Sequence, residues 1–348
     1  MQMTKISATQ YWKMLTVALF WGATWVAGRI AVGEVSPLAA ASWRFLLAAI
    51  VLGALLLQKE GWPRWSRQDL LGIFGLGVSG IFLYNLCFLY GLQHIEAGRG
   101  ALVVALTPVA IAVADVLFFG AAMTLKRGAG IAIALAGCLL VVTRGKVELL
   151  LGGVGVGELL ILGCVVLWTA YTFVGRSVGQ RLSPLSATFG ASLAGWLMLT
   201  FAAVLDGSLF AMNNLTANGV FSIAFLGILG TAVAFTWYAE AVGQLGATRT
   251  GMFINLVPLF AVLLGAAILH ERLTAATLFG GALIVAGVVT LNWSTGMIEA
   301  NSPVVAGEAN AKTETTMQQG GRAKDALCAV ACGNTPSPIY LSGKAGQT

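Results

Sequence analysis

Charged residues are scarce in this sequence. Only 10% of its 348 residues are Asp, Glu, Lys or Arg, whereas 58% are hydrophobic and the mean hydropathy is +0.85. No soluble domain of this length needs so much apolar surface, so the composition predicts a polytopic membrane protein. The net charge of +6 is spread through short polar segments rather than gathered in one patch, and we therefore expect no nucleic-acid partner.

Motifs for metal, nucleotide or catalytic chemistry are missing as well. The chain has 5 cysteines and 2 histidines. Cys328 and Cys332 have a C-x3-C spacing that matches no common zinc or redox pattern, and the H-E-x-x-H pattern that begins at His270 fails because residue 274 is threonine. There is also no P-loop lysine motif. We expect no metal, no cofactor and no catalytic residue, and hence a protein that is not an enzyme.

Three glycines imitate a nucleotide-binding motif. Gly75, Gly77 and Gly80 spell G-x-G-x-x-G, but they lie within an apolar run and lack the preceding strand that a dinucleotide site requires. Close packing between helices explains them better. The same explanation is expected for two alanine pairs, Ala132 with Ala136 and Ala282 with Ala286.

Long apolar runs are what the sequence contains instead. There are ten, each roughly long enough to cross a hydrocarbon core of about 30 Å. They occupy residues 14–32, 37–57, 70–90, 97–119, 125–143, 157–175, 184–205, 217–238, 246–269 and 275–292. The sequence therefore predicts an all-α integral membrane protein with ten transmembrane helices. Residues 1–13 would form an N-terminal arm, since the first run is too long for a cleaved signal peptide, and residues 294–348 a disordered tail.

Basic residues are distributed unevenly between the alternate loops that join these runs. If the N-terminus is cytoplasmic, the arm and the inner loops contain ten Lys and Arg residues, whereas the outer loops contain five. The positive-inside rule then places both termini in the cytoplasm. The expected location is the bacterial inner (plasma) membrane, which the chain would cross several times.

The two halves of the chain repeat one another. At an offset of 147 residues, Trp21, Gly28, Arg29, Ser36 and Pro37 align with Trp168, Gly175, Arg176, Ser183 and Pro184; at an offset of 150, Gly77, Gly80, Arg99, Pro108, Thr124, Gly130 and Gly137 align with Gly227, Gly230, Arg249, Pro258, Thr274, Gly280 and Gly287. Five runs per copy is an odd number, so the second copy must enter the bilayer from the opposite side. We expect a first repeat at 14–143, a linker loop at 144–156 and a second repeat at 157–293. Inverted repeats of this kind are typical of carriers that open alternately to the two sides.

Several of these residues resemble a known family. LFWGATW around Trp21, SPLAAASWRF at 36–45, the two mid-run prolines and HERLT at 270–274 resemble the EamA-like family of the drug/metabolite transporter superfamily. The resemblance covers residues 14–292. It implies a ten-helix carrier with a cavity lined mainly by runs 1, 3, 4, 6, 8 and 9, which exports small metabolites or amino acids. The family's Gly-Glu-x-Leu-Thr signature survives only from Glu271, and Ala121 stands at the corresponding place in the first copy, so the acidic role is assigned to Glu271 alone.

Each copy has a proline near the middle of its fourth run. Pro108 and Pro258 remove a backbone donor and free the carbonyl groups of Val104 and Ile254. Carbonyl groups freed near the bilayer midplane can bind a substrate or permit a gating bend, although a purely structural kink explains the prolines equally well. Asn255, beside the second kink, should face the interior, because an amide that faces lipid is costly.

Aromatic residues recur at helical spacing on runs 1, 3, 6 and 8, which the resemblance places around the cavity. The candidates for the cavity wall are Trp21, Trp25, Tyr84, Trp168, Tyr171 and Phe235, with Asn85 as a polar neighbour and with Phe88 and Tyr238 completing the pairs. An aromatic wall with a few polar groups suits an apolar or cationic metabolite. Tryptophans near the ends of runs serve instead as interfacial anchors. This is expected for Trp12, Trp62, Trp65 and Trp293.

Three charged residues are candidates for coupling or gating. Arg44 lies about two turns into the second run, where a charge must pair, snorkel or face water, and a structural role is favoured over contact with substrate. Asp115 could relay a proton or pair with a basic residue at 126 or 127. Glu271, like Glu240, is open to the same two interpretations. No acidic residue lies in the middle of the first run, where a small multidrug antiporter would need one.

Three functions follow from these features. The first is a secondary carrier that exports small organic solutes, driven by the proton gradient, with a small molecule and the lipid bilayer as its partners. The second is an intramembrane enzyme or lipid-handling protein, and the third is a channel. A multidrug or cation exporter of the same superfamily is a variant of the first. Between a monomer and a homodimer the sequence makes no choice.

Overall fold

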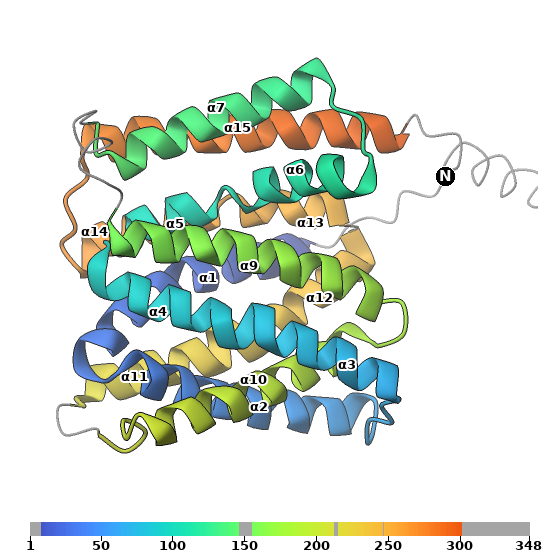
Figure 1. Cartoon of the computed structure of the whole chain (residues 1–348), viewed down its shortest axis with the longest axis vertical. Coiled ribbons are helices and arrows are strands. Elements are labelled where there is room, and N and C mark those ends of the chain that lie inside the picture. Colours follow the sequence, from blue (N-terminus) through green and yellow to red (C-terminus); the bar gives the residue numbers. More distant parts are fainter. Residues whose placement is uncertain (1–7, 146–154, 212–214, 246, 301–348) are drawn as a thin grey trace, which may run out of the picture. The chain divides into compact units, whose positions relative to one another are not determined.

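The computed structural model describes residues 8–145, 155–211, 215–245 and 247–300, and these are helical apart from their connections. The residues up to Trp293 belong to one compact unit, to which the following description applies. The helices of the first half run in the order α1 (Ala8–Glu34), α2 (Pro37–Lys59), α3 (Arg67–Leu76), η1 (Gly77–Leu83), α4 (Tyr84–His94), α5 (Ala97–Val104), α6 (Thr107–Phe119) and α7 (Leu125–Val142). Figure 1 shows them lying side by side.

The second half has the same order of elements. It contains α9 (Val156–Val178), α10 (Pro184–Leu205), α11 (Ala217–Gly227), η2 (Ile228–Val233), α12 (Ala234–Leu245), α13 (Ala247–Ile254), α14 (Val257–Ile268) and α15 (Ala275–Ala300). Every apolar run expected from the sequence coincides with one helix or with one series of consecutive helices. Within the described residues, eight helices are long and apolar enough to cross a membrane, and Val257–Ile268 and Ala275–Leu291 are shorter apolar helices. The structure is therefore that of a multi-pass helical membrane protein.

The beginnings of two helices illustrate how closely the halves correspond. Ser36 precedes Pro37 at the start of α2, and its hydroxyl accepts a hydrogen bond from the backbone of Ala39 at 3.1 Å. Ser183 precedes Pro184 at the start of α10 and accepts from Ser186 at 3.0 Å. A serine cap followed by proline is a strong helix start, because the hydroxyl satisfies a free amide and proline needs none. The Ser-Pro pairs thus determine where two corresponding helices begin.

The expected tail begins later than the sequence indicated. The helix α15 continues to Ala300, so residues 294–300 are helical rather than irregular. The remainder of the predicted tail, 301–348, lies outside the described residues, as do most of the arm at 1–13 up to residue 7 and part of the linker at 146–154. The tail was predicted to begin at Ser294 because the sequence becomes polar there. A helix can nevertheless continue for several residues after its apolar face has ended.

Two π-helical segments occupy the same place in the two halves. The segment η1 joins α3 to α4, and η2 joins α11 to α12 about 150 residues later, matching the offset of the sequence repeat. Two glycines of the false nucleotide motif, Gly77 and Gly80, lie in η1. A Cβ added at Gly77 would lie 2.9 Å from the Cβ of Ala194 on α10, and one added at Gly80 would overlap the ring of Tyr171 on α9. The expectation that close helix packing accounts for these glycines is confirmed.

The contact between α7 and α15 is made by glycines rather than alanines. A Cβ added at Gly137 would lie 2.6 Å from the carbonyl oxygen of Gly280, and one added at Gly287 would lie 2.6 Å from that of Gly130. The expected packing role of the alanine pairs is wrong. Ala132, Ala136, Ala282 and Ala286 are all exposed. They were chosen for their small size, but the glycines one or two residues away allow the closer approach of backbones and therefore form the interface.

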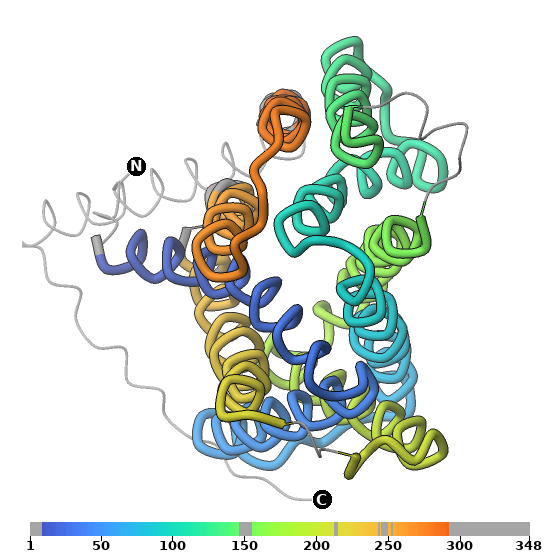
Figure 2. The backbone as a smooth tube through the Cα atoms, turned by 90° about the vertical axis from the view of Figure 1, so that its left-hand side faces the viewer, coloured from blue at the N-terminus to red at the C-terminus, as the bar shows by residue number. Residues whose placement is uncertain are grey.

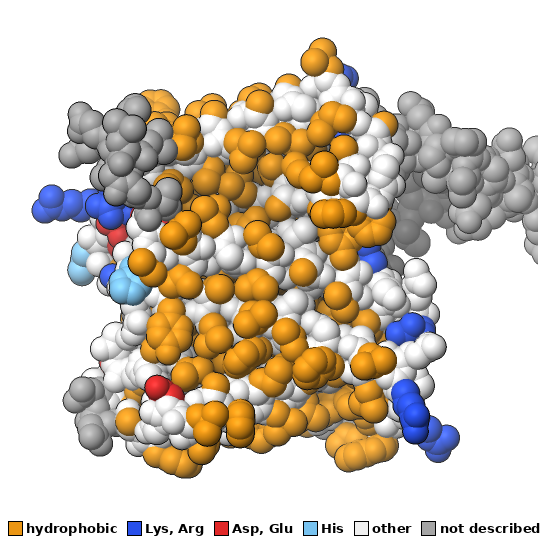
Figure 3. Space-filling model, in the orientation of Figure 1, with side chains coloured by type: hydrophobic (Ala, Val, Ile, Leu, Met, Phe, Trp, Pro, Cys, Tyr) orange, Lys and Arg blue, Asp and Glu red, His pale blue; other side chains and the backbone are white. Residues whose placement is uncertain are grey.

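Helix α1 runs through the interior of the unit. It packs against α4 and α5 of its own half and against α11, α12 and α14 of the other half. Figure 2 shows α1 in dark blue between the cyan and the yellow-to-orange helices. In Figure 3 the visible face is hydrophobic across its middle, and the Lys and Arg side chains gather at the two edges where helices end. This distribution is what a bilayer requires of a spanning protein.

Candidate functional site

The aromatic residues proposed from the sequence meet in one connected network. The ring of Trp168 on α9 lies 5.3 Å from Tyr84, 5.0 Å from Tyr171 and 6.3 Å from Phe235, measured between centroids. Trp21 on α1 lies 5.4 Å from Phe235. These distances are typical of attractive ring pairs. We call Trp21, Tyr84, Trp168, Tyr171 and Phe235 the aromatic network; it joins both halves of the chain.

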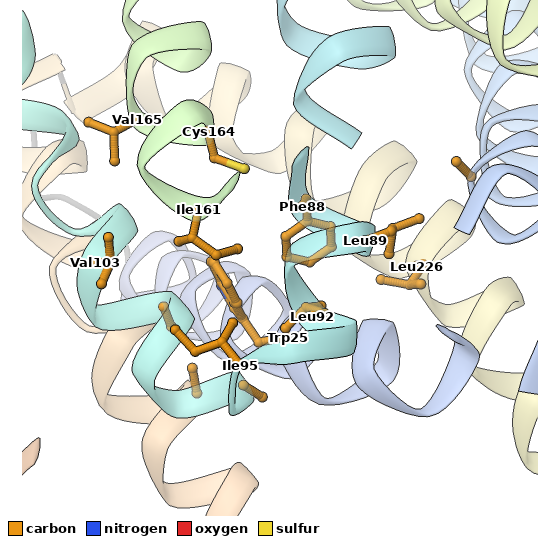
Figure 4. Packing of buried hydrophobic residues seen from close by; sticks show 14 of the residues in the cluster. Trp25, Phe88, Leu89, Leu92, Ile95, Val103, Ile161, Cys164, Val165 and Leu226 are labelled. Atoms are coloured by element: carbon orange, nitrogen blue, oxygen red, sulfur yellow. The ribbon is translucent and has the colours of Figure 1, made fainter. Parts of the chain in front are cut away.

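The far end of this network merges with the hydrophobic core. Tyr84 stacks on Phe88 at 6.0 Å, and Phe88 meets Trp25 edge to face at 4.9 Å. Trp25 is only 4% exposed, and Figure 4 shows it packed with Leu92 and Ile161. Trp25 therefore stabilises the packing of α1 against α4 and α9, whereas the five network residues are only partly buried.

A hollow reaches the network from the end of the bundle that carries Lys59. Its volume is about 220 Å³, and it lies between α2, α10 and α12. Phe235 and Thr236 line its deeper part, and Lys59 and Glu240 are among the residues around it. Glu240 is bonded to Lys59 at 2.9 Å and to Lys13 at 3.3 Å. The ion pair of Lys59 with Glu240 and the aromatic ring of Phe235 thus line the same depression.

Arg44 is held in the interior by two neutral side chains. Its side chain is 8% exposed, Nη1 donates to Asn85 Oδ1 at 3.0 Å, and Nη2 donates to Thr231 Oγ1 at 3.1 Å. Asn85 lies in the first turn of α4, two residues after the end of η1, and Thr231 lies within η2, so Arg44 connects α2 to both π-helical regions. Asn85 uses its amide nitrogen on the carbonyl of Ile81 at 2.7 Å and is itself 2% exposed. Asn85 is therefore a partner of Arg44 rather than an open position in a wall.

Both proline-containing helices are broken where the prolines predicted a bend. The breaks fall at residues 105–106 and 255–256, and Pro108 and Pro258 lie in the first turn of the helix that follows. The freed carbonyl of Val104 accepts a hydrogen bond from the hydroxyl of Thr107 at 2.7 Å. Val257 occupies the corresponding place in the second copy and has no hydroxyl. The two breaks therefore differ in how their free carbonyls can be satisfied.

The second helix break lies against α1, which carries Trp21: a Cβ added at Gly22, the residue after Trp21, would lie 3.0 Å from the carbonyl oxygen of Val257, the residue before Pro258. Asn255 and Pro108 are partly buried, and Pro258 is buried. No ring contact or hydrogen bond of the described residues joins Pro108, Asn255 or Pro258 to the aromatic network. A single site that contains both prolines and the aromatic residues therefore stays a prediction.

Asp115 has a different partner from those considered in the sequence. Its carboxylate binds Arg176 on α9 at 2.8 and 3.4 Å, whereas Arg127 donates to the carbonyl of Ala122 at 3.0 Å. The expected pairing with a residue at 126 or 127 is therefore wrong. Lys126 and Arg127 are close to Asp115 in the sequence, but α9 packs alongside α6 and places the guanidinium of Arg176 against Asp115.

Glu271 closes the start of a helix in the other half. Its two oxygens accept hydrogen bonds from the backbone nitrogens of Ala97 at 2.7 Å and Gly98 at 3.0 Å, the first residues of α5. The first amides of a helix have no internal partner and carry partial positive charge, so a carboxylate is well placed there. Beside it, Arg99 is 3% exposed and pairs with Glu158 at 2.9 Å. Ala121, at the place that corresponds to Glu271, cannot provide such a cap.

Sequence reasoning missed several of the residues that hold the interior together. Thr231, Glu158 and Arg181 were not proposed, although they bind Arg44, Arg99 and Asp69 respectively. Glu158 could have been found, because a carboxylate in the first turn of a predicted span has to satisfy its charge. Thr231 gave no signal, since threonine is common in apolar helices.

Comparison with known proteins now identifies the class of this molecule. The fold and its interior define a multi-pass helical membrane protein with no metal cluster among the described residues. The model of the EamA-like transporter family matches it twice, at residues 9–143 and 155–293, and the chain belongs to this family. It is a transporter family, so the protein acts on a small-molecule substrate and is not an enzyme.

Individual relatives agree with this assignment. The chain is 29% identical over 282 residues to the uncharacterized transporter YyaM of Bacillus subtilis, covering 80% of this chain and 92% of that one. It is 26% identical over 283 residues to a probable terminal-alkyne amino-acid exporter of Streptantibioticus cattleyicolor, covering 81% and 92%. A crystal structure with 20% identity has a TM-score of 0.58 and covers 82% of this chain and 97% of that chain, which shows a shared fold.

Proposed function

We propose that this protein is a secondary active transporter of the plasma membrane that exports small metabolites, such as amino acids or related organic solutes, by alternating access coupled to protons. Membership of the EamA-like family supports transport, and the printed name of the Streptantibioticus cattleyicolor relative supports export of an amino acid. The aromatic network is the observation within this chain that carries the proposal. It joins four spans from both halves, and one of its residues, Phe235, lines the hollow at the Lys59 end.

The proposed cycle depends on ten helices arranged as two inverted five-helix repeats. The π-helical segments at one offset and the reciprocal glycine contacts between α7 and α15 support this arrangement. The polar contacts between distant segments support it too, since each joins segments that the proposed topology places on one side. Examples are Thr216 with Glu34 at 2.8 Å and Arg181 with Asp69 at 2.9 Å. Both termini would then be cytoplasmic, and the hollow would open to the cytoplasm.

Export needs a substrate route from the cytoplasm and a group that carries the driving proton. The hollow at the Lys59 end supports the first requirement, with Trp21, Trp168 and Phe235 as the proposed binding surface. For the second requirement we propose Asp115, whose partner Arg176 is 52% exposed and can be released to water when Asp115 is protonated.

The alternatives have less support. An intramembrane enzyme would need a nucleophile, an acid pair or a metal site near the hollow. The two carboxylates around the hollow are already engaged, since Glu60 accepts a hydrogen bond from Ser183 at 2.6 Å and Glu240 pairs with Lys59 and Lys13, and the described residues include no metal-binding cluster. An exporter of organic cations would have to bring a cation towards the buried positive charge of Arg44. A carrier of neutral, zwitterionic or anionic solutes avoids that repulsion.

Flux in proteoliposomes tests the proposal. The full chain is reconstituted, a panel of labelled amino acids and related organic solutes is offered, and counterflow is measured with and without a proton gradient. We expect counterflow that saturates with solute concentration. The proton gradient should speed the movement of solute away from the proton-poor side. Ohmic current, product formation, or flux that never saturates would contradict a carrier.

A further inference from the structure

Arg44 is a buried cation without a counter-ion. Its two recorded partners, Asn85 and Thr231, are neutral, and no carboxylate of the described residues forms an ion pair with it. Arg99 provides the comparison within the same chain, since it is equally deeply buried but has the carboxylate of Glu158 at 2.9 Å. A charge within the hydrocarbon region is costly unless it is paired, and residues of this kind mark functional sites in membrane proteins.

Arg44 also has hydrogen-bonding capacity to spare. A guanidinium group has five N–H donors, and Asn85 and Thr231 each take one from a terminal nitrogen. The remaining internal donor, Nε, has no partner and is inaccessible to solvent. Two neutral acceptors thus fix the plane of the group while leaving Nε and further N–H groups unoccupied. Free N–H groups of a guanidinium can bind a planar carboxylate through two parallel hydrogen bonds. Arg99 has unpartnered N–H groups too, so Arg44 is distinguished by having no ion-pair partner among the described residues.

The position of Arg44 connects it with the aromatic network. Tyr84 directly precedes Asn85, which accepts a hydrogen bond from Arg44 at 3.0 Å. On the other side, Thr231 lies about one turn before Phe235, and the indole of Trp21 donates to the carbonyl of Gly230 at 3.1 Å. Along α2, Arg44 lies eight residues, or about 12 Å, deeper than Leu52, which lines the hollow. The guanidinium therefore lies beyond the residues that line the hollow, on the side away from Lys59.

Arg44 lies between the two π-helical regions, one from each half of the chain. Arg44 binds Asn85, two residues after the end of η1, and Thr231 within η2, and these segments correspond in the two halves. Such segments break the regular helix ladder and occur often at functional sites. A ligand that neutralised Arg44 would therefore remove the positive charge at the place where α2, α4 and η2 meet.

We propose that Arg44 binds a carboxylate group of the transported solute, while an apolar side group of the same solute lies on Tyr84, Trp168 and Phe235. The substrate class is then a small carboxylic acid with an apolar or aromatic side group, which includes zwitterionic amino acids. Asn85 and Thr231 are positioning residues for the guanidinium. This inference rests on the proposed carrier function and specifies what that carrier recognises.

Binding of matched acids and amides tests the inference. The purified full chain is studied in a neutral detergent without anionic lipid, so that no headgroup supplies the carboxylate, and calorimetric titrations use L-phenylalanine, L-leucine and the primary amide of each. We expect at least one acid to bind ten-fold or more tightly than its amide. In Arg44→Gln the acid should lose ten-fold or more in affinity while the amide is unaffected, and Arg44→Lys should keep part of the preference for the acid. Arg64→Gln, at an exposed position, is the control and should keep all of it.

A structural role for Arg44 makes different predictions. Thr231→Val removes one neutral partner but leaves the charge, and we expect it to weaken acid binding less than Arg44→Gln does. Equal affinity for acid and amide in the unmodified protein, binding of none of the four compounds, or an unchanged ratio in Arg44→Gln would each overturn the inference. If saturable flux of an uncharged or cationic solute persisted undiminished in Arg44→Gln, the carrier function would stand and the inference would fall. The absence of saturable flux for every solute would contradict the carrier function itself.

Discussion

At the scale of single residues, Trp168 has the most contacts within the aromatic network. Its indole meets Tyr171 on its own helix and Tyr84 and Phe235, which belong to two further helices, α4 and α12. Each such ring pair contributes roughly 0.5–1.5 kcal/mol beyond simple burial. Trp168 therefore holds the surface on which the proposed substrate lies.

Replacement of Trp168 by alanine should reduce transport at least ten-fold, because it removes both the binding surface and the support of its neighbours. Trp168→Phe should retain an intermediate rate. Initial uptake rates in proteoliposomes, normalised to the amount of folded protein in each preparation, measure the effect. Trp62→Ala is the matched control, since Trp62 is 80% exposed and lies outside the network. Equal losses in Trp168→Ala and Trp62→Ala would contradict a specific role.

Glu271 should stabilise the start of α5. Loss of a side-chain cap costs about 1–2 kcal/mol, so Glu271→Ala should lower the thermal midpoint by several degrees. Glu96 makes the matched control, because it precedes α5 directly but its side chain makes no capping hydrogen bond. Glu96→Ala should change the midpoint far less. A larger effect from Glu96 than from Glu271 would show that the contacts of Glu271 with Ala97 and Gly98 contribute little.

The sequence predicted residue types better than it predicted partners. The aromatic residues were chosen by helical spacing, and spacing determines which face of a helix they share, so they meet as expected. Asp115 and Glu271 depend on which distant helix packs alongside, and one sequence contains no record of that packing. The pairing of Asp115 with Arg176 and the capping of α5 by Glu271 could therefore be found only in three dimensions.

At the scale of helices, the broken spans are the elements suited to bending. Thr107 satisfies the freed carbonyl of Val104 and so makes the first break more rigid than the second, where Val257 stands instead. The freed carbonyl does not need a substrate in the first copy. The sequence predicted both breaks from proline alone, because proline cannot continue the hydrogen-bond ladder.

Exchange of the hydroxyl between the two breaks tests this difference. Thr107→Val leaves a buried carbonyl unsatisfied and should lower stability by about 1 kcal/mol, which a shift of the thermal midpoint would detect. Val257→Thr should raise the midpoint or leave it unchanged, since it adds a hydrogen bond that the first break already has. The opposite order of the two midpoints would show that the hydroxyl of Thr107 does not support the break.

The glycines at the π-helical segments should tolerate no side chain where they meet a neighbour. Gly80→Ala would overlap the ring of Tyr171 and displace it from the aromatic network, so we expect destabilisation of about 1–3 kcal/mol together with reduced transport. Gly75→Ala is the control one turn away, since its Cβ would lie 3.4 Å from Val174 in near-ordinary contact. Thermal midpoints of the two variants that coincide would contradict the close approach of η1 to α9.

The π-helical segments themselves could not be foreseen. Glycine pairs at one offset indicated close packing, but the same pairs fit a regular α-helix equally well. The extra residue in each π-helical turn depends on the helices that press against it, including α10 against η1 and α2 against η2. Sequence periodicity thus predicted the spans, and tertiary packing determined their irregularities.

At the scale of the whole unit, the two ends of the bundle are closed differently. The Glu34 end is held by the buried pair of Arg99 with Glu158 and by the capping of α5 by Glu271. The Lys59 end contains the hollow, and its ion pairs include exposed members such as Lys59 at 50% and Arg176 at 52%. A structure closed by buried contacts at one end and hollowed at the other is suited to accept solute from the hollowed end.

The fold class was available from the sequence because hydrophobic length is a strong constraint in a bilayer. A segment without water must satisfy its backbone internally, so each apolar run had to become a helix. The repeat in sequence then became a repeat of elements. An odd number of spans per copy predicts opposite orientations of the two copies, and the proposed transport cycle depends on this prediction.

Side-specific labelling of two cysteine variants tests that orientation most directly. Trp62→Cys and Phe210→Cys are introduced singly into a chain freed of its native cysteines, at positions that are 80% and 76% exposed. They occupy corresponding loops of the two copies. In intact cells, a membrane-impermeant maleimide should label the cysteine at position 210 from outside, and should reach the cysteine at position 62 only after permeabilisation. Labelling of both positions from the same side would contradict the inverted repeat.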